Sequence, residues 1–307
     1  MSILRQALED YLSVRHALGF KLEKASQLLP NFISFMEREG ATTVTTELAL
    51  AWATDTKESV NWRAARLNIV RGFARYLQAI DPNTEVPPTD LLPHRNDRAV
   101  PYIYTEAEIT ALMAATQTLR LCLQRATYAT LIGLLAVTGM RVGEAIRLDR
   151  DDVDLEHRVL IVRDTKFGKS REIAVHPSTV AALEAYSRYR NELIQNPSSP
   201  SFFVSRAGAR LIHHVVEHTY RFLVRQAGLH HPSPGRRPRL HDFRHTFAVR
   251  TVLDWYRDGV DVAAHFPLLS TYLGHVNPLS TYWYFSATPE LLALASKRLP
   301  HGYGALR

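Results

Sequence analysis

The chain of 307 residues has one cysteine, Cys122, and lacks several features that would define other protein classes. A single thiol cannot form a disulfide within the chain. Its apolar, helix-like surroundings predict a small buried side chain in a reducing compartment. No apolar run approaches the roughly 18 residues of a membrane span. The first ten residues form an amphipathic pattern without the basic start and apolar block of a signal peptide. We therefore expect a cytoplasmic protein.

Two common ligand-binding motifs are present only in part. Residues 168–170 (Gly-Lys-Ser) resemble the end of a phosphate-binding P-loop, but Arg163 stands where that loop needs a glycine, which excludes nucleotide binding. His241 and His245 have the spacing of a zinc-binding pair. However, Asp242 replaces the glutamate of a zinc protease, and no third ligand is apparent. The sequence thus predicts neither a metal nor another cofactor.

Positive charge is concentrated in the second part of the chain. The net charge is +7 and the isoelectric point is near 9.6. Residues 1–100 contain 12 Lys+Arg and 12 Asp+Glu, whereas residues 101–307 contain 25 and 18, together with 12 of the 14 histidines. This distribution favours an anionic partner and predicts that most basic and titratable chemistry lies after residue 100.

Five prolines between residues 80 and 101 divide the chain, because proline at this density disfavours both helix and strand. Before them, apolar spacing predicts helices within 3–39, at 47–54 and at 58–79. In the last of these, Trp62 lies on the apolar side. Arg63, Arg71 and Arg75 lie on the other, where they form either a solvated face or a face against a DNA backbone.

After the prolines, the pattern predicts a mostly helical domain with a small sheet. A capping box at Thr105–Glu108 begins a helix. The β-rich runs Arg158–Arg163 and Arg171–Val175 flank a turn-rich segment and predict a hairpin. Further helices are expected at about 119–137, 142–148, 177–195, 211–227, 240–257, 262–272 and 289–298. The fold class is mainly α, with a helical domain at 1–92, a linker at 93–101 and a mixed α/β domain at 102–307.

A phosphate-binding face is predicted around residue 241. His241 and Arg244 are three residues apart and therefore share one face of a helix. Five arginines lie within residues 236–250, among them Arg239. Guanidinium groups match phosphate oxygens with paired hydrogen bonds, so this cluster fits phosphate better than it fits a cation.

Four segments, taken in order, resemble the tyrosine recombinase (integrase) family. They are Thr138–Glu144 (Thr-Gly-Met-Arg-Val-Gly-Glu), a lysine-bearing turn at 165–171, His241–Arg244, and Leu273-Gly274-His275 followed nine residues later by Tyr284. Each is common alone, but their order and spacing together are typical of that family. The resemblance covers the whole second domain. The first domain resembles the family's helical, SAM-like core-binding domain in size, and residues 280–290 resemble transposon-borne members.

The resemblance implies cleavage of DNA by phosphoryl transfer through a 3′-phosphotyrosine, which conserves the bond energy and needs no ATP. Tyr284 would be the nucleophile, Lys166 the general acid and His241 the general base. Arg141 and Arg244 would bind the non-bridging oxygens, and Glu144 would orient the arginines. The implied catalytic residues are Arg141, Lys166, His241, Arg244, His275 and Tyr284, with DNA contacts from Arg63, Arg71, Arg75, Lys169 and Arg239.

Several alternatives remain open at this point. Tyr282 is the rival nucleophile and Lys169 the rival acid, although the nine-residue step from His275 favours Tyr284 and the family's lysine is the first of the turn. The resemblance implies duplex DNA with specific sites as the partner, a homotetramer in synapsis and a nucleoid-associated protein. A type IB topoisomerase or a non-catalytic DNA-binding regulator would share part of this pattern.

Overall fold

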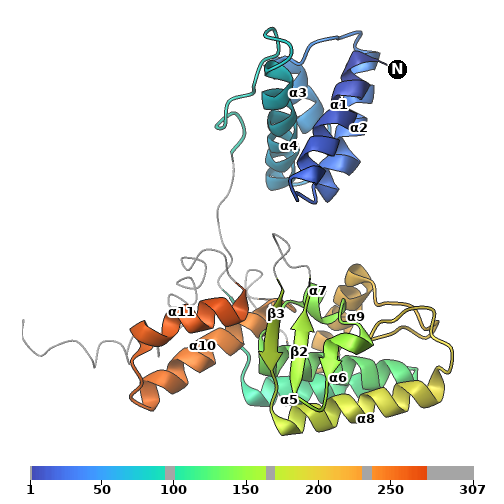
Figure 1. Ribbon diagram of the computed structural model, residues 1–307, viewed down its shortest axis with the longest axis vertical. Coiled ribbons are helices and arrows are strands. Elements are labelled where there is room, and N and C mark those ends of the chain that lie inside the picture. Colours follow the sequence, from blue (N-terminus) through green and yellow to red (C-terminus); the bar gives the residue numbers. More distant parts are fainter. Residues whose placement is uncertain (1, 94–100, 164–169, 230–236, 275–307) are drawn as a thin grey trace, which may run out of the picture. The chain divides into compact units, whose positions relative to one another are not determined.

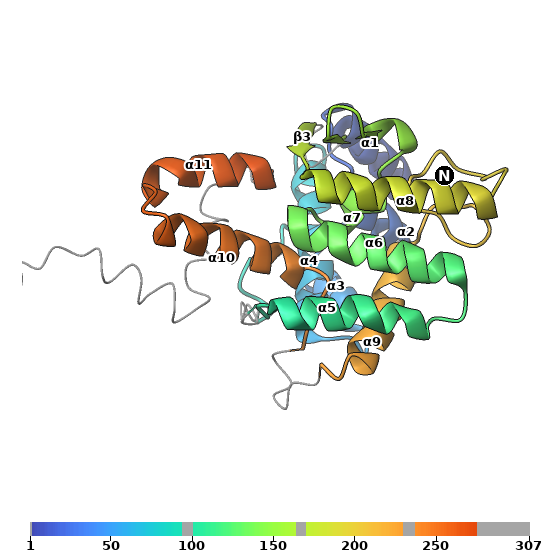
Figure 2. The same cartoon turned by 90° about the horizontal axis from the view of Figure 1, so that it is seen from below.

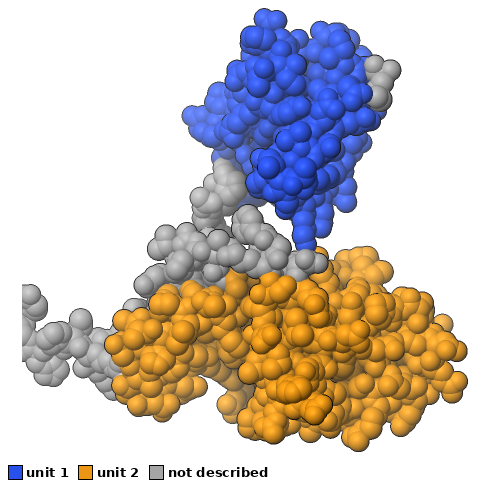
Figure 3. Space-filling view, in the orientation of Figure 1, with its two compact units in different colours: residues 1–98 blue, residues 99–307 orange. Residues whose placement is uncertain are grey.

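The computed structural model describes residues 2–93, 101–163, 170–229 and 237–274. The chain divides into two compact units, residues 1–98 and 99–307, each with its own core (Figure 3). The division falls within the segment 93–101 that the sequence predicts to be a linker. Within the described ranges, every helix is too short or too polar to cross a membrane.

The described residues of unit 1 form four helices, close to the stretches 3–39, 47–54 and 58–79 that the apolar spacing predicts to be helical (Figure 1). Serine or threonine precedes three of them, and its side chain accepts a hydrogen bond from the backbone N–H three residues later. Leu29, Phe32 and Phe73 are fully buried in the shared core. The helices are α1 (Ile3–Ala17), α2 (Glu23–Arg38), α3 (Thr46–Thr54) and α4 (Val60–Gln78).

The segment after α4 folds back onto unit 1. The N–H of Glu85 donates to the carbonyl of Val44 at 2.8 Å, and the Glu85 carboxylate accepts from the N–H of Thr46 at 2.7 Å. Val86 and Leu92 pack against the core of this unit. Residues 85–92 therefore belong to the first domain despite their prolines.

Unit 2 combines helices with a three-stranded antiparallel sheet of order β1-β2-β3. Val162 pairs with Arg171 in the β2–β3 hairpin, which confirms the predicted hairpin; the two-residue strand β1 was not predicted. The elements are α5 (Glu106–Ala115), η1 (Thr116–Thr118), α6 (Cys122–Thr138), α7 (Val142–Ala145), η2 (Arg150–Asp152), β1 (Val153–Asp154), β2 (Val159–Val162), β3 (Arg171–Ala174), α8 (Pro177–Leu193), α9 (His213–Gln226), α10 (Asp242–Arg257) and α11 (Val262–Leu273).

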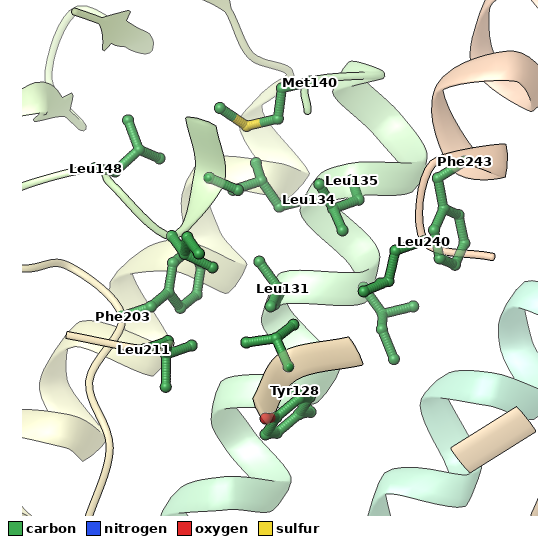
Figure 4. Packing of buried hydrophobic residues seen from close by; sticks show 14 of the residues in the cluster. Tyr128, Leu131, Leu134, Leu135, Met140, Leu148, Phe203, Leu211, Leu240 and Phe243 are labelled. Atoms are coloured by element: carbon green, nitrogen blue, oxygen red, sulfur yellow. The ribbon is translucent and has the colours of Figure 1, made fainter. Parts of the chain in front are cut away.

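Helix α6 lies at the centre of the core of unit 2. Figure 4 shows Leu131 of α6 between Phe243, from the start of α10, and Phe203, from the segment after α8. All three side chains are essentially removed from solvent. This packing fixes α6 relative to the start of α10, and predicted catalytic residues lie just after α6 and at the start of α10.

Helices α10 and α11 form a hairpin with a small apolar cluster of its own (Figures 1 and 2). Val249 and Val252 of α10 pack there with Val262 and Leu269 of α11. The start of α10 and the end of α11 lie at the same end of this hairpin, next to the body of the unit. The helix predicted at 289–298 lies outside the described residues.

The expectation that Cys122 is buried was wrong. Helix α6 begins at Cys122 and not at Leu119, so the thiol lies in the first turn, and the residue is exposed. Leu123, the next residue, is the one that enters the core.

Candidate active site

The first part of the site is the junction of α6 and α7. Helix α6 is closed by Gly139, whose φ of 59° is left-handed, as expected for a glycine that caps a helix. The chain then turns so that Arg141 precedes the first residue of α7. The backbone N–H of Arg141 donates to Oε2 of Glu144 at 2.9 Å, and its Nη1 donates to Oε1 at 2.8 Å. Glu144 therefore fixes both the turn and the arginine.

Glu144 also binds an arginine of the sheet, Arg171. Nη2 of Arg171 lies 2.7 Å from Oε2, and Nη1 lies 3.2 Å from Oε1. Burial raises the pKa of Glu144, but the bonds and charges of Arg171 and Arg141 outweigh it and lower the pKa to about 2. The carboxylate is therefore ionised at neutral pH and partly neutralises two guanidinium groups.

The second part of the site is the start of α10. His241 directly precedes this helix, and Arg244 lies in its first turn. The side chain of Arg244 is buried, with 1% of the residue exposed. Its Nη1 donates to the carbonyl of Gly139 at 3.1 Å, and its Nη2 donates to the carbonyl of Leu273. One guanidinium group thus joins the ends of α6 and α11.

His241 lies among positive charges. Burial of the ring, followed by the charges of Arg244, Arg141 and Arg239, lowers the pKa of His241 to about 4, against a smaller opposite effect of Glu144. The residue keeps an exposed surface, through which solvent weakens both the effect of burial and that of the guanidinium charges without reversing the direction of the shift. His241 is therefore neutral at pH 7 and can accept a proton.

The third part of the site is the end of α11. Gly274 closes this helix with a left-handed φ of 67°. Nε of Arg171 donates to the carbonyl of Tyr272 at 2.9 Å, next to the bond from Arg244 to Leu273. Two arginines therefore hold the last turn of α11, which leads into His275 of the Leu-Gly-His motif.

A family model described as the phage integrase family matches residues 103–290. The chain belongs to this family. It is 43% identical to a Sinorhizobium fredii protein named "Putative integrase/recombinase y4rB", over 97% of this chain and 98% of that one. It is 30% identical to the tyrosine recombinase XerD of Pseudomonas putida, over 82% of this chain and 80% of that one.

Solved structures of recombinases share the fold of this integrase-family chain. The Tn1549 transposon integrase in complex with transposon right end DNA matches with a TM-score of 0.61 at 19% identity, over 95% of this chain and 99% of that one. The XerA recombinase matches with a TM-score of 0.52 at 23% identity, over 96% of this chain and 99% of that one. At these identities the likeness concerns the fold, which is the mainly helical fold with a small sheet that the sequence predicts.

The structure of this integrase-family chain brings together four of the residues that the motifs single out. Arg141 and Glu144 are hydrogen-bonded to each other. Arg244 binds the turn that carries them and, after burial, contributes most to the lowered pKa of His241. Arg239 is half exposed, and its Nη2 donates to Oδ1 of Asp242 at 2.9 Å. The predicted residues Lys166, Lys169, His275 and Tyr284, and the rival Tyr282, lie outside the described residues.

The expectation for the arginines of α4 requires a correction. Arg71 is buried, and its guanidinium group donates to the carbonyls of Pro87 at 2.7 Å and Pro88 at 2.6 Å, so it holds the segment after α4 and does not lie on the open face that was expected. Arg63 is partly buried and donates to the carbonyl of Thr56 at 2.8 Å. Arg75 is exposed.

Two residues of the site were not singled out for it from the sequence. Arg171 was treated only as part of a strand, because its partners Glu144 and Tyr272 are far away in sequence. Asp242 has a fully buried side chain that holds Arg239, and its spacing of three residues from Arg239 could have indicated this pair. Across the described residues, no three histidine, cysteine, aspartate or glutamate side chains gather in a way that could hold a metal ion.

Proposed function

We propose that this chain is a site-specific DNA recombinase that cleaves and rejoins duplex DNA through Tyr284. The observation that carries the proposal is the gathering of Arg141, His241 and Arg244 beside the last turn of α11. That turn leads into His275, and Tyr284 follows nine residues later. Family membership and the recombinase–DNA complexes among the structural neighbours support DNA as the partner.

In the proposed reaction, the hydroxyl oxygen of Tyr284 attacks a DNA phosphorus and gives its proton to neutral His241. The bond from phosphorus to the 5′-oxygen breaks, and this oxygen takes a proton from Lys166. The products are a 3′-phosphotyrosine and a free 5′-hydroxyl. Attack by the 5′-hydroxyl of another strand reverses the steps and rejoins the DNA.

The arginines would stabilise the negative charge on the non-bridging oxygens. The buried Arg244 is held by two carbonyls, so its guanidinium plane is fixed before substrate arrives. One such preorganised donor typically contributes roughly 100–1000-fold in rate. Arg141 is more accessible, with 38% of its side chain exposed, and Glu144 holds it in place. His275 would add a hydrogen bond to the phosphate.

The proposal extends to binding and assembly. Arg63, Arg75, Lys169 and Arg239 would contact the DNA backbone, and four copies would pair two sites in synapsis. The transposon integrase among the structural neighbours supports a role in integration, excision or transposition of a mobile element.

The decisive experiment traps the covalent intermediate. The protein is incubated in excess EDTA with DNA from the ends of the element that carries its gene, and is then denatured. We expect a protease-sensitive protein–DNA band for the wild type and for Tyr282→Phe, and none for Tyr284→Phe. The band should persist in EDTA because the site supplies its own cations. An adduct with Tyr284→Phe, or its loss with Tyr282→Phe alone, would contradict the assignment of the nucleophile.

The same assay separates the other candidate functions. A wild type that binds this DNA without forming an adduct would be a DNA-binding regulator. Relaxation of supercoiled DNA without a paired site, and without strand exchange, would indicate a topoisomerase.

A further inference from the structure

We infer that Arg171 is a positioning residue, which locks the last turn of α11 to Glu144 and so sets where the Leu-Gly-His motif meets the active site. This inference rests on the proposed function only for its effect on cleavage. Arg171 is the first residue of β3 and is held in the sheet by pairing with Val162. Figures 1 and 2 show the end of α11 next to β3.

All three nitrogens of the Arg171 guanidinium group donate hydrogen bonds. Nη1 and Nη2 bind the two oxygens of Glu144 at 3.2 and 2.7 Å, while Nε binds the carbonyl of Tyr272 at 2.9 Å. Only 12% of the Arg171 side chain and 9% of the Glu144 side chain are exposed, so water competes little for these bonds. A lysine would keep the charge but could not make this planar, three-pronged contact.

Gly274, the residue after Leu273, leaves room for the guanidinium group of Arg171. A Cβ built on Gly274 would lie 2.9 Å from Nη1 of Arg171, and the φ of 67° also favours glycine. The glycine of the motif therefore serves two purposes: it ends the helix, and it lets Arg171 approach the backbone.

Arg171 and Arg244 both connect the end of α11 to the rest of the site. The hairpin of α10 and α11 has its own apolar cluster, separate from the main core of unit 2. Arg244 ties the carbonyl of Leu273 to the end of α6, and Arg171 ties the carbonyl of Tyr272 to Glu144. Glu144 also holds Arg141, so Arg171 places the segment leading to His275 relative to a predicted catalytic arginine.

The first test needs no DNA. We would compare amide hydrogen exchange in the wild type, Arg171→Lys and the control Arg190→Lys. Arg190 is also buried and donates to a carbonyl, that of Phe202, but it lies on α8. In Arg171→Lys we expect exchange over residues 270–274 to be roughly tenfold faster or more, with the β2–β3 hairpin unchanged. Unchanged exchange there, or equal acceleration in Arg190→Lys, would overturn the inference.

The second test measures cleavage. Arg171→Lys should bind site DNA as the wild type does but form the covalent adduct about 10–100-fold more slowly, because small displacements at a reacting centre are costly. Arg190→Lys should cleave normally when folded. The Arg171→Lys defect should persist on DNA with sulfur at the 5′-bridging position, because Arg171 acts through α11 and not through Lys166. Normal cleavage, weakened binding alone, or full recovery on the sulfur substrate would each overturn it.

The two tests separate this inference from the proposed function. If exchange at the end of α11 increases as expected while the wild type forms no adduct, the positioning by Arg171 stands and the recombinase assignment fails. If the wild type forms the adduct and Arg171→Lys behaves like it in both tests, the recombinase assignment stands and the inference fails.

Discussion

Burial and three nearby guanidinium groups together decide the protonation state of His241. Burial of the ring, followed by the charges of Arg244, Arg141 and Arg239, lowers the pKa of His241 to about 4. In an unfolded chain the pKa of histidine is near 6.5. Between these values the unfolded state binds the extra proton and the folded state does not. The stability that neutral His241 contributes is therefore present above about pH 6.5 and is lost as the pH falls toward about 4.

The first prediction follows from the loss of stability that the lowered pKa of His241 implies at low pH. Acidification from about pH 7 to 4.5 should lower the Tm of the wild type more than that of His241→Gln, since the variant has no such group to protonate. His218→Gln serves as control, because His218 is an exposed histidine on α9. Differential scanning calorimetry measures the effect. Parallel loss of Tm in the wild type and His241→Gln would show that His241 does not carry this linkage.

A second prediction concerns Lys166 as the general acid. Lys166→Ala should cleave normal DNA very slowly, because an alkoxide is a poor leaving group without a proton. It should recover on DNA whose 5′-bridging oxygen is replaced by sulfur, because a thiolate leaves unprotonated. Lys169→Ala is the matched control and should show no such selective recovery. Equal defects of Lys166→Ala on both substrates would assign Lys166 another role.

The third prediction separates the two arginines of α4 that differ most in exposure. Arg75→Ala should reduce the slope of log K against log salt for DNA binding by about 1, as the loss of one phosphate contact requires. Arg71→Ala should leave the slope unchanged but reduce the free energy of unfolding by about 2–3 kcal/mol, because buried carbonyls lose a charged donor. Fluorescence titrations across salt concentrations and urea unfolding measure both. An unchanged slope for Arg75→Ala would mean that Arg75 is a solvated surface residue that does not contact DNA.

At the scale of elements, the end of α6 serves both fold and site. Gly139 is left-handed, and its carbonyl accepts a hydrogen bond from Arg244. A Cβ there would lie 2.5 Å from Cδ1 of Phe247 on α10. A Cβ added to Gly143, in the same motif, would meet no atom within 4 Å, and the φ of Gly143 is not positive. The two glycines of one motif therefore differ in their structural demands.

The fourth prediction uses this pair. Gly139→Ala should lower the free energy of unfolding by about 1–3 kcal/mol, from backbone strain, with the clash against Phe247 adding to it. Gly143→Ala should be neutral or raise it by about 0.5–1 kcal/mol, as alanine favours a helix interior. Urea denaturation monitored by circular dichroism gives both values. Equal effects of the two substitutions would mean that neither the φ nor the contact with Phe247 matters at Gly139.

Elements with local signals were predictable from the sequence, and those without were not. The capping box is confirmed, because Thr105 and Glu108 exchange hydrogen bonds at the start of α5. The β2–β3 hairpin is confirmed because both strands are β-rich and flank turn residues. Strand β1 was missed because two residues, Val153–Asp154, carry no alternation.

The residues of the site also divide into those with a local sequence signal and those without one. Arg141, Glu144, His241 and Arg244 could be predicted as site residues because they lie in short motifs. Arg171 was missed because its partners lie 27 and 101 residues away. The expected open face at Arg71 is covered, because a helical wheel gives the sides of α4 but not the segment that later packs on one of them, which here contains Pro87 and Pro88.

At the scale of the whole molecule, the charge distribution differs between the two units. Residues 1–100 are neutral, while the excess of basic residues and most histidines lie in residues 101–307, together with every proposed catalytic residue. Each unit has a separate apolar core. The proposed chemistry thus lies within the second unit, and the proposed pairing of DNA sites requires contacts between copies of the chain.

The last prediction concerns those contacts. Thr288-Pro289-Glu290 is a strong helix start, with a hydroxyl at the N-cap, proline at the first position and an acid near the positive end of the helix dipole. An apolar stripe of Leu291, Leu292, Ala295 and Leu299 follows. We expect this helix to pack either on its own unit or, as the family resemblance implies, on a neighbouring copy in the proposed tetramer.

Deletion of residues 288–307 decides between these possibilities. If the stripe docks on a neighbour, the shortened protein should fold and bind one site, but lose cooperative pairing of sites and most strand exchange while Tyr284 remains. Deletion of residues 300–307, beyond the stripe, is the matched control and should keep both activities. Gel shifts with one and two sites, together with thermal unfolding, provide the measurements. Normal synapsis without residues 288–307 would refute docking on a neighbour, and a collapsed thermal transition would instead place the stripe in the core of its own unit.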